Sequence, residues 1–196
     1  MLTVFLLSPA NCAGTRAQLL LKSQTSPLTA RLANGGAPIG EVFTFMSSLY
    51  FRGKLAYATR FGGGRAYVIT PGRGLLPADV LIRVEDLRQM AGVAVDEALP
   101  AFREPLVRDA RAIADNLEPA DRVVLLGSVA TNKYVGPLLD VFGDRLYFPP
   151  TFAGRGDMSR GGLLLRSARA GTPLDYVPLR GAVRHGPKPP KLPRLA

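Results

Sequence analysis

The sequence predicts an α/β protein with a mostly parallel sheet of about four to five strands and flanking helices. Short apolar runs of strand length alternate along the chain with longer segments whose apolar residues recur at helical spacing. The composition, 47% hydrophobic and 20% charged residues, is typical of a globular chain. A length of 196 residues suits one domain, which we place at residues 1–178.

Five runs are expected to be strands: residues 2–7, 66–70, 121–128, 145–149 and 174–178. The first is a short continuous apolar run, as in a central parallel strand. It lacks the basic residues and the length of a secretory signal, so we interpret it as a buried strand. Residues 71–79 are expected to be a loop that follows the second strand.

Four helices are expected between and after these strands. The first covers Ile39–Phe61, with Gly53 as a weak position inside it. The second has an apolar face from Leu99 to Leu117, and Pro105 either kinks that helix or marks its start. The third falls within residues 130–143, with Pro137 as an obstacle. The last follows residue 157.

The opening of that last helix is unusual, with the sequence GRGDMSRGG at residues 154–162. Asp157 suits a helix N-cap, and Met158, Gly161, Leu165 and Ala168 would then share one face. Each glycine costs roughly 1 kcal/mol inside a helix. We therefore expect Gly161 and Gly162 to permit close approach to a strand or to a ligand.

The strand ends carry the functional prediction. Ligands of open parallel sheets bind beyond the carboxyl ends of the strands. Most of the residues there are glycines, arginines or residues with a hydroxyl group. This combination suits the binding of a phosphate-bearing anion. The candidate binding residues are Ser8, Asn11, Gly14, Arg16, Thr70, Arg73, Gly74, Gly127, Ser128, Arg155, Gly156, Ser159 and Arg160. Lys133 and Tyr134, near a helix start, could contact a phosphate, although residues in such a position are more often simply exposed.

The formal charge of +10 fits an anionic partner, either nucleic acid or a phosphorylated small molecule. Residues 179–196 contain five lysines or arginines and no acid. This proline-rich basic tail is expected to be extended or disordered, and it could dock on a protein partner. The same charge is also compatible with ordinary solubility.

The sequence lacks the residues that several common catalytic, metal and cofactor sites require. His185 is the single histidine and lies in the tail, which argues against a Ser-His-Asp triad and against zinc sites. No phosphate loop or dinucleotide fingerprint occurs, and we expect neither a metal site nor a cofactor. Cys12 is the single cysteine, so no internal disulfide forms; it suits a small buried residue and a cytoplasmic protein. No apolar run reaches membrane-span length, and we expect no membrane partner.

Two stretches, FLLSPANC at residues 5–12 and AYVITPGRGLLPADVLI at residues 66–82, resemble the YaaA family of bacterial peroxide-stress proteins. The pairs Leu49-Tyr50 and Tyr57-Ala58 match a related group of small bacterial proteins. The chain departs from the family by having Arg73 where a tyrosine precedes Gly-Leu-Leu. The resemblance implies a cytoplasmic protein that binds DNA or a nucleotide, with Ser8 and residues 70–79 at the site.

Three functional hypotheses follow. The first is binding of nucleic acid or a nucleotide at the strand ends. The second is an enzyme that cleaves or transfers a glycosidic bond of a phosphorylated nucleoside or sugar, with Asp157 as acid, base or nucleophile. The third is a protein-interaction module that uses the proline-rich tail.

Overall fold

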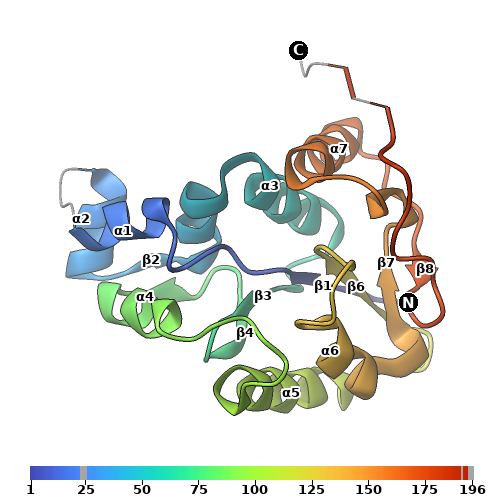
Figure 1. Cartoon of the computed structure of the whole chain (residues 1–196), viewed down its shortest axis with the longest axis horizontal. Helices are drawn as coiled ribbons and strands as arrows, with labels where there is room; N and C mark the ends of the chain where they lie inside the picture. The colour runs from blue at the N-terminus through green and yellow to red at the C-terminus, as the bar shows by residue number, and fades with distance from the viewer. Residues whose placement is uncertain (23–25, 191, 194–196) are drawn as a thin grey trace.

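The computed structural model describes residues 1–22, 26–190 and 192–193. Its main sheet has six strands in the order β4-β3-β1-β6-β7-β8 (Figure 1). The four inner strands are parallel, and both edge strands are antiparallel. The bounds are β1 Thr3–Leu7, β3 Ala66–Thr70, β4 Gly74–Pro77, β6 Arg122–Leu126, β7 Leu146–Phe148 and β8 Val177–Pro178. The predicted α/β class and the mostly parallel sheet are confirmed.

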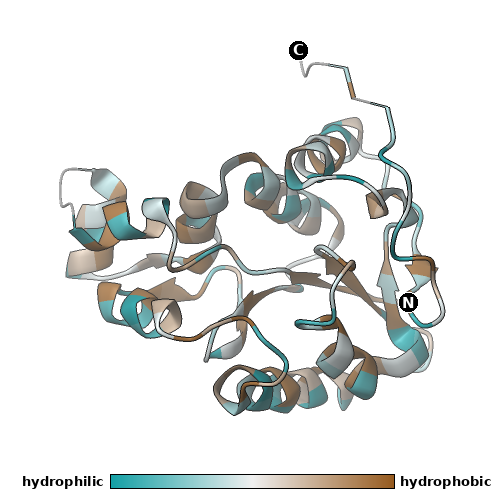
Figure 2. Cartoon of the chain, in the orientation of Figure 1, coloured by the Kyte–Doolittle hydropathy of each residue, from teal (hydrophilic) through white to brown (hydrophobic). Residues whose placement is uncertain are grey.

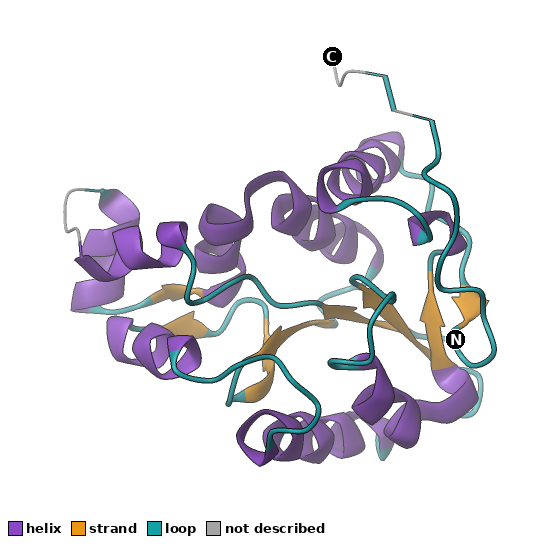
Figure 3. Cartoon of the chain, in the orientation of Figure 1, coloured by secondary structure: helices purple, strands orange, loops and turns teal. Residues whose placement is uncertain are grey.

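Helices cover both faces of this sheet (Figure 3). Helices α3 (Ile39–Phe61) and α7 (Asp157–Ala170) lie on one face, and α5 (Pro100–Ala114) and α6 (Val135–Phe142) lie on the other (Figure 1). Successive side chains of a strand point to opposite faces. Phe5 and Leu7 of β1 therefore pack in the α3 core, whereas Val4 and Leu6 pack in the α5 core. Both faces of β1 are buried, which explains its uninterrupted apolar sequence. Figure 2 shows the apolar strands between these two helical layers.

A smaller layer lies beside the β4 end of the sheet and was not anticipated. It contains α1 (Thr15–Lys22), α2 (Pro27–Asn34), α4 (Val84–Ala91) and a two-stranded sheet of β2 (Ala37–Pro38) and β5 (Leu81–Ile82) (Figure 1). Helix α2 begins with a capping box between Ser26 and Thr29. These elements are only two to eight residues long, too short for a clear apolar period.

The main sheet has one strand more than expected because part of the loop at residues 71–79 pairs as β4. Thr70 and Gly74 are paired at the turn, and Gly74 has a φ of +70°. That backbone conformation suits glycine and lets the chain reverse directly onto β3. This turn forms because β3 and β4 pair with each other. The apolar run GLLP did not by itself predict that pairing.

Two proline positions also differ from expectation. Helix α5 begins at Pro100, so Pro105 lies inside the helix and does not mark its start. Helix α6 begins at Val135, which places Pro137 in the first turn. A missing N–H costs little there, because first-turn N–H groups have no partner within the helix.

The face predicted for α7 is also wrong in part. Met158 is exposed, whereas Arg160, Gly161 and Gly162 are buried. Gly156 occupies the N-cap position with no side-chain cap, so Asp157 is the first helical residue and not the cap. The Asp157 carboxylate instead accepts a hydrogen bond from Arg160, one turn further along the helix.

The tail runs from the sheet along α7 (Figure 1). Residues 179–190 and 192–193 contain no helix or strand, and Leu179 is buried. Arg184 donates a hydrogen bond to the side chain of Asn132, and Arg166 of α7 donates one to the carbonyl of Pro193. The remaining positions of the predicted tail, 191 and 194–196, lie outside the described residues.

Candidate functional site

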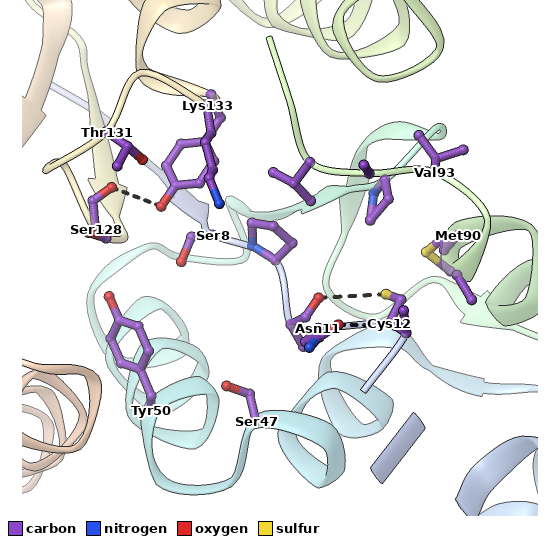
Figure 4. Close-up of a pocket in the computed structure, with 18 of the residues that line it drawn as sticks. Ser8, Asn11, Cys12, Ser47, Tyr50, Met90, Val93, Ser128, Thr131 and Lys133 are labelled. Carbon is purple, nitrogen blue, oxygen red and sulfur yellow. Dashed lines mark hydrogen bonds between the residues drawn. The ribbon is translucent and has the colours of Figure 1, made fainter. Parts of the chain in front are cut away.

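A cavity of about 910 Å³ opens at the carboxyl ends of β1, β3 and β6. Because these strands are parallel neighbours, the loops that follow them meet at one edge of the sheet. Ser8, Asn11, Tyr50, Ser128, Lys133 and Asp157 are among the polar residues that line it. Figure 4 shows Ser8 and Asn11 on the chain after β1, with Ser128, Thr131 and Lys133 on one side of them and Ser47 and Tyr50 of α3 on another.

Ser8 is the first residue beyond β1. Its N–H donates to the carbonyl of Leu126 at 3.1 Å, which continues the pairing of β1 with β6 past the end of the strand. The residue opposite is Gly127, and a Cβ there would lie 2.7 Å from Ser8 Cβ and 3.0 Å from Tyr134 Oη. Gly127 therefore allows the Ser8 and Tyr134 hydroxyl groups to approach each other.

Lys54 of α3 lies directly behind Ser8 and is fully buried. Its Nζ donates to the Ser8 carbonyl at 2.6 Å and lies 2.9 Å from Ser8 Oγ. The rings of Tyr50 and Phe51 lie 4.4 and 4.6 Å from the same nitrogen. Among the described residues, no carboxylate forms an ion pair with Lys54.

Burial lowers the pKa of Lys54 to about 7. The Asp157 carboxylate raises this pKa and the Arg160 guanidinium lowers it, but both effects are smaller than that of burial. The amine is therefore present in both protonation states near neutral pH. That is unusual for a lysine, and it is characteristic of lysines that act as bases.

The close packing of α3 against α7 brings these groups together. A Cβ on Gly53 would lie 2.6 Å from the Gly161 carbonyl, and a Cβ on Gly161 would lie 2.7 Å from the Leu49 carbonyl. The close approach that we expected of Gly161 is therefore made to a helix, and not to a strand or a ligand. It places Tyr50 and Lys54 of α3 next to the first turn of α7.

Helix α3 is also kinked beside the cavity. Ser48 has φ +51° and ψ −126°, and it is the one non-glycine residue with positive φ in the described chain. Such a conformation costs of order 1–3 kcal/mol and persists only where the surroundings impose it. The kink lies between Ser47 and Tyr50, which both line the cavity.

Arg160 and Asp157 form the α7 side of the site. The buried Arg160 guanidinium donates to the Asp157 carboxylate at 3.2 Å and to the Phe152 carbonyl at 3.3 Å. The Asp157 side chain remains 67% exposed and reaches the cavity.

The Tyr50 hydroxyl is buried without a hydrogen bond of ordinary geometry to any described residue. Burial raises the pKa of Tyr50, and the Arg160 guanidinium opposes that rise in part. A buried hydroxyl in this state is costly unless a ligand or water bonds to it.

The structure brings some predicted site residues together and separates others. Ser8, Asn11, Ser128 and Asp157 line the cavity, while Gly127 and Arg160 lie behind it. Lys133 lines it as well, and Tyr134, also a lining residue, donates to the Ser128 carbonyl at 2.8 Å.

The other candidates lie outside the lining and have local partners. Arg16 donates to the Phe45 carbonyl, Thr70 is buried and donates to the Gly74 carbonyl, and Arg73 pairs with Asp86. The Gly14 N–H donates to the Asn11 carbonyl at 3.2 Å, and a Cβ on Gly74 would collide with Asp109. Arg155, Gly156 and Ser159 line a separate groove between α7 and the tail.

Lys54 was missed as a site residue. The available signal was its position: Lys54 follows Tyr50 by four residues and precedes Tyr57 by three, which places a lysine on the apolar face of α3. Lysines are rarely buried, so a lysine on such a face indicates a special environment. Cys12 is buried, and burial raises the pKa of its thiol to about 12, which keeps it protonated and unreactive.

Comparison with protein-family models, with curated proteins and with solved structures found no match to this chain. No described helix is both long enough and apolar enough to cross a membrane. The described residues also contain no group of three or more histidine, cysteine, aspartate and glutamate side chains arranged to hold a metal ion.

Proposed function

We propose that the cavity at the carboxyl edge of the sheet binds a small anionic ligand that bears phosphate, such as a nucleotide. The observation that carries this proposal is a local excess of positive charge. Lys133 lines the cavity, and the buried Arg160 guanidinium lies directly behind its wall. Among the described lining residues, Asp157 is the single carboxylate. A bound anion offsets the cost of burying the Arg160 guanidinium.

The loop between β6 and α6 supplies groups that suit a phosphate. Ser128 and Thr131 provide hydroxyl groups, Lys133 provides an ammonium, and the loop leads into the N-terminus of α6. Hydroxyl groups and an ammonium are a common combination at phosphate sites. The Tyr50 hydroxyl and the Asn11 side chain remain for the uncharged part of the ligand.

A mononucleotide fits the site better than a polymer does. The volume of about 910 Å³ falls within the range of pockets that enclose small molecules. Arg73 forms an ion pair with Asp86, and Arg155 donates a hydrogen bond to the Thr151 carbonyl. These two arginines would otherwise have extended a phosphate-binding surface beyond the cavity. The net charge of +10 still favours some sequence-independent attraction to nucleic acid. The resemblance to YaaA proteins likewise implies a nucleotide or DNA ligand.

The alternative of glycosidic bond cleavage keeps one supporting observation, since Asp157 lines the same cavity. Its carboxylate is already bonded to Arg160, which favours a role in holding α7 against the site.

A thermal-shift screen, followed by calorimetric titration, tests the proposal. The probes are AMP, ATP, ribose 5-phosphate, single-stranded DNA and duplex DNA, each at low and moderate salt. We expect a nucleotide to bind in a manner that survives moderate salt, and we expect Lys133→Ala to weaken it by about tenfold. Lys22→Ala, which removes an exposed lysine of α1, is the matched control. Stabilisation by DNA alone, fading with salt, would contradict the proposal.

A further inference from the structure

The Ser8 hydroxyl lies between the cavity and a buried amine. Ser8 lines the cavity, whereas Lys54 does not and is fully buried. The Lys54 nitrogen is 2.9 Å from Ser8 Oγ. A molecule in the cavity therefore meets the serine hydroxyl, and the amine reaches that molecule only through Ser8.

The surroundings of Lys54 favour its neutral, basic form. Tyr50 and Phe51 face it from α3, Arg160 and Asp157 act on it from α7, and burial is the dominant influence on its pKa. A neutral amine can donate one N–H to the Ser8 carbonyl and use its lone pair to accept the Oγ proton. An ammonium cannot accept that proton.

Tyr134 helps to hold Ser8 in place. Burial raises the pKa of Tyr134 to about 12, and a hydrogen bond with Ser8 is among the influences that oppose the rise. The phenol is therefore protonated at neutral pH and donates to the Ser128 carbonyl. Two side chains from different parts of the chain, Lys54 and Tyr134, thus converge on one hydroxyl that faces a cavity.

We propose that Ser8 is a nucleophile, that Lys54 is its general base, and that the pair acts on a carboxylic ester of the ligand bound in the cavity. This inference rests on the proposed function for the location of the ligand, but it does not depend on the ligand's phosphate. A serine hydroxyl hydrogen-bonded to a lysine amine is an established alternative to the pairing of serine with histidine.

The reaction balances with water as the second reactant. Ser8 Oγ attacks the ester carbonyl carbon and its proton passes to the Lys54 amine. The bond from the carbonyl carbon to the alkoxy oxygen then breaks, and the leaving alkoxide takes that proton and departs as an alcohol. Water next attacks the acyl-serine, giving its proton to Lys54, and the Ser8 oxygen recovers that proton as the carboxylic acid leaves.

The first test is labelling of the full-length protein with an alkyl fluorophosphonate. Attack by Ser8 Oγ on phosphorus would release fluoride and pass the hydroxyl proton to Lys54. We expect a single adduct, mapped to Ser8 by peptide mass spectrometry, with a labelling rate that rises as pH passes through about 7. Ser8→Ala should abolish the adduct, and Ser159→Ala, outside the cavity, should leave it unchanged.

The second test addresses the base and the reaction class. Lys54→Met should slow labelling of Ser8 by about a hundredfold or more, provided that circular dichroism shows it folded. If it does not fold, the pH profile of the wild-type rate decides the question, and a flat profile would overturn the role of Lys54. We also expect p-nitrophenyl acetate to acetylate Ser8 and to release nitrophenolate. Labelling without ester turnover would overturn the assignment of an ester substrate.

The two proposals fail in different ways. Nucleotide binding without fluorophosphonate labelling would leave the ligand site standing and would make Ser8 and Lys54 a structural pair. Labelling of Ser8 without binding of any phosphate-bearing probe would retain the nucleophile and remove the anionic ligand.

Discussion

At the scale of single residues, the buried amine of Lys54 is the most consequential feature of the protein. Its neighbours are aromatic rings, a serine and an arginine, and the Asp157 carboxylate on α7 opposes the lowering of its pKa. A lysine in such a place reduces stability whenever it is protonated. A role of the amine at Ser8 would account for a lysine in this position.

Replacing Lys54 with methionine should change how stability depends on pH. In the folded protein the pKa is lowered to about 7, whereas unfolding restores an ordinary value of about 10.4. Between these values the unfolded chain binds one more proton than the folded chain, so wild-type stability rises with pH. We expect the free energy of unfolding of the wild-type protein, relative to that of Lys54→Met, to rise by up to about 1.4 kcal/mol per pH unit above about pH 7.

Urea unfolding of both proteins across this pH range measures the difference. Below about pH 7 the two curves should run parallel, because both states of the wild-type chain then carry the proton. Curves that remain parallel at higher pH would show that the pKa of the amine is not lowered in the folded protein.

At the scale of elements, the packing of α3 on α7 builds the back wall of the cavity. The two helices touch through Gly53 and Gly161, which lets one backbone rest on the other. The neighbouring Gly162 has a different environment, because a Cβ there would meet only Leu192, at an ordinary contact distance of 3.7 Å. The two adjacent glycines of α7 are therefore not equivalent.

This difference predicts opposite outcomes for two alanine substitutions. Gly161→Ala should lower the free energy of unfolding by about 1–3 kcal/mol, because the new methyl group would strike the backbone of α3. Gly162→Ala should raise it by up to about 1 kcal/mol, because alanine is the better helix former and has room. Urea unfolding of the two variants checks this, and equal effects would show that the helices do not touch at Gly161.

At the scale of the whole molecule, the net positive charge is divided between the body of the protein and its tail. The five basic residues of positions 179–196 supply half of the net charge of +10. The described part of the tail lies along α7 and, through Arg184, contacts Asn132 in the loop beside the cavity. Attraction to nucleic acid should therefore depend on the tail, while binding of a small ligand should depend on the cavity.

Removal of residues 187–196 separates these two contributions. It deletes Lys188, Lys191 and Arg194, and the salt-dependence slope of DNA binding should fall by about 0.9 for each phosphate that the tail no longer neutralises. Fluorescence anisotropy with a labelled duplex across a salt series measures that slope. Affinity for a nucleotide should stay unchanged in the same truncated protein. An unchanged slope would show that the tail does not bind phosphates of the DNA.

The order of residues alone was enough to predict the α/β class, the inner strands and the edge of the sheet at which Ser8, Asn11, Ser128 and Asp157 meet. These features follow from local information, because burial of β1 and β6 on both faces requires continuous apolar runs. Parallel pairing then places the residues after those strands at one edge.

Tertiary packing was needed to show that Lys54 sits behind Ser8, that Arg73 and Arg155 are bonded elsewhere, and that Gly161 contacts a helix. Lys54 and Ser8 are 46 residues apart and meet because α3 crosses the end of β1. No periodicity or local motif records such a contact. The contact between Lys54 and Ser8 arises because helices pack on the sheet. That packing buries the Lys54 amine and places it beside Ser8.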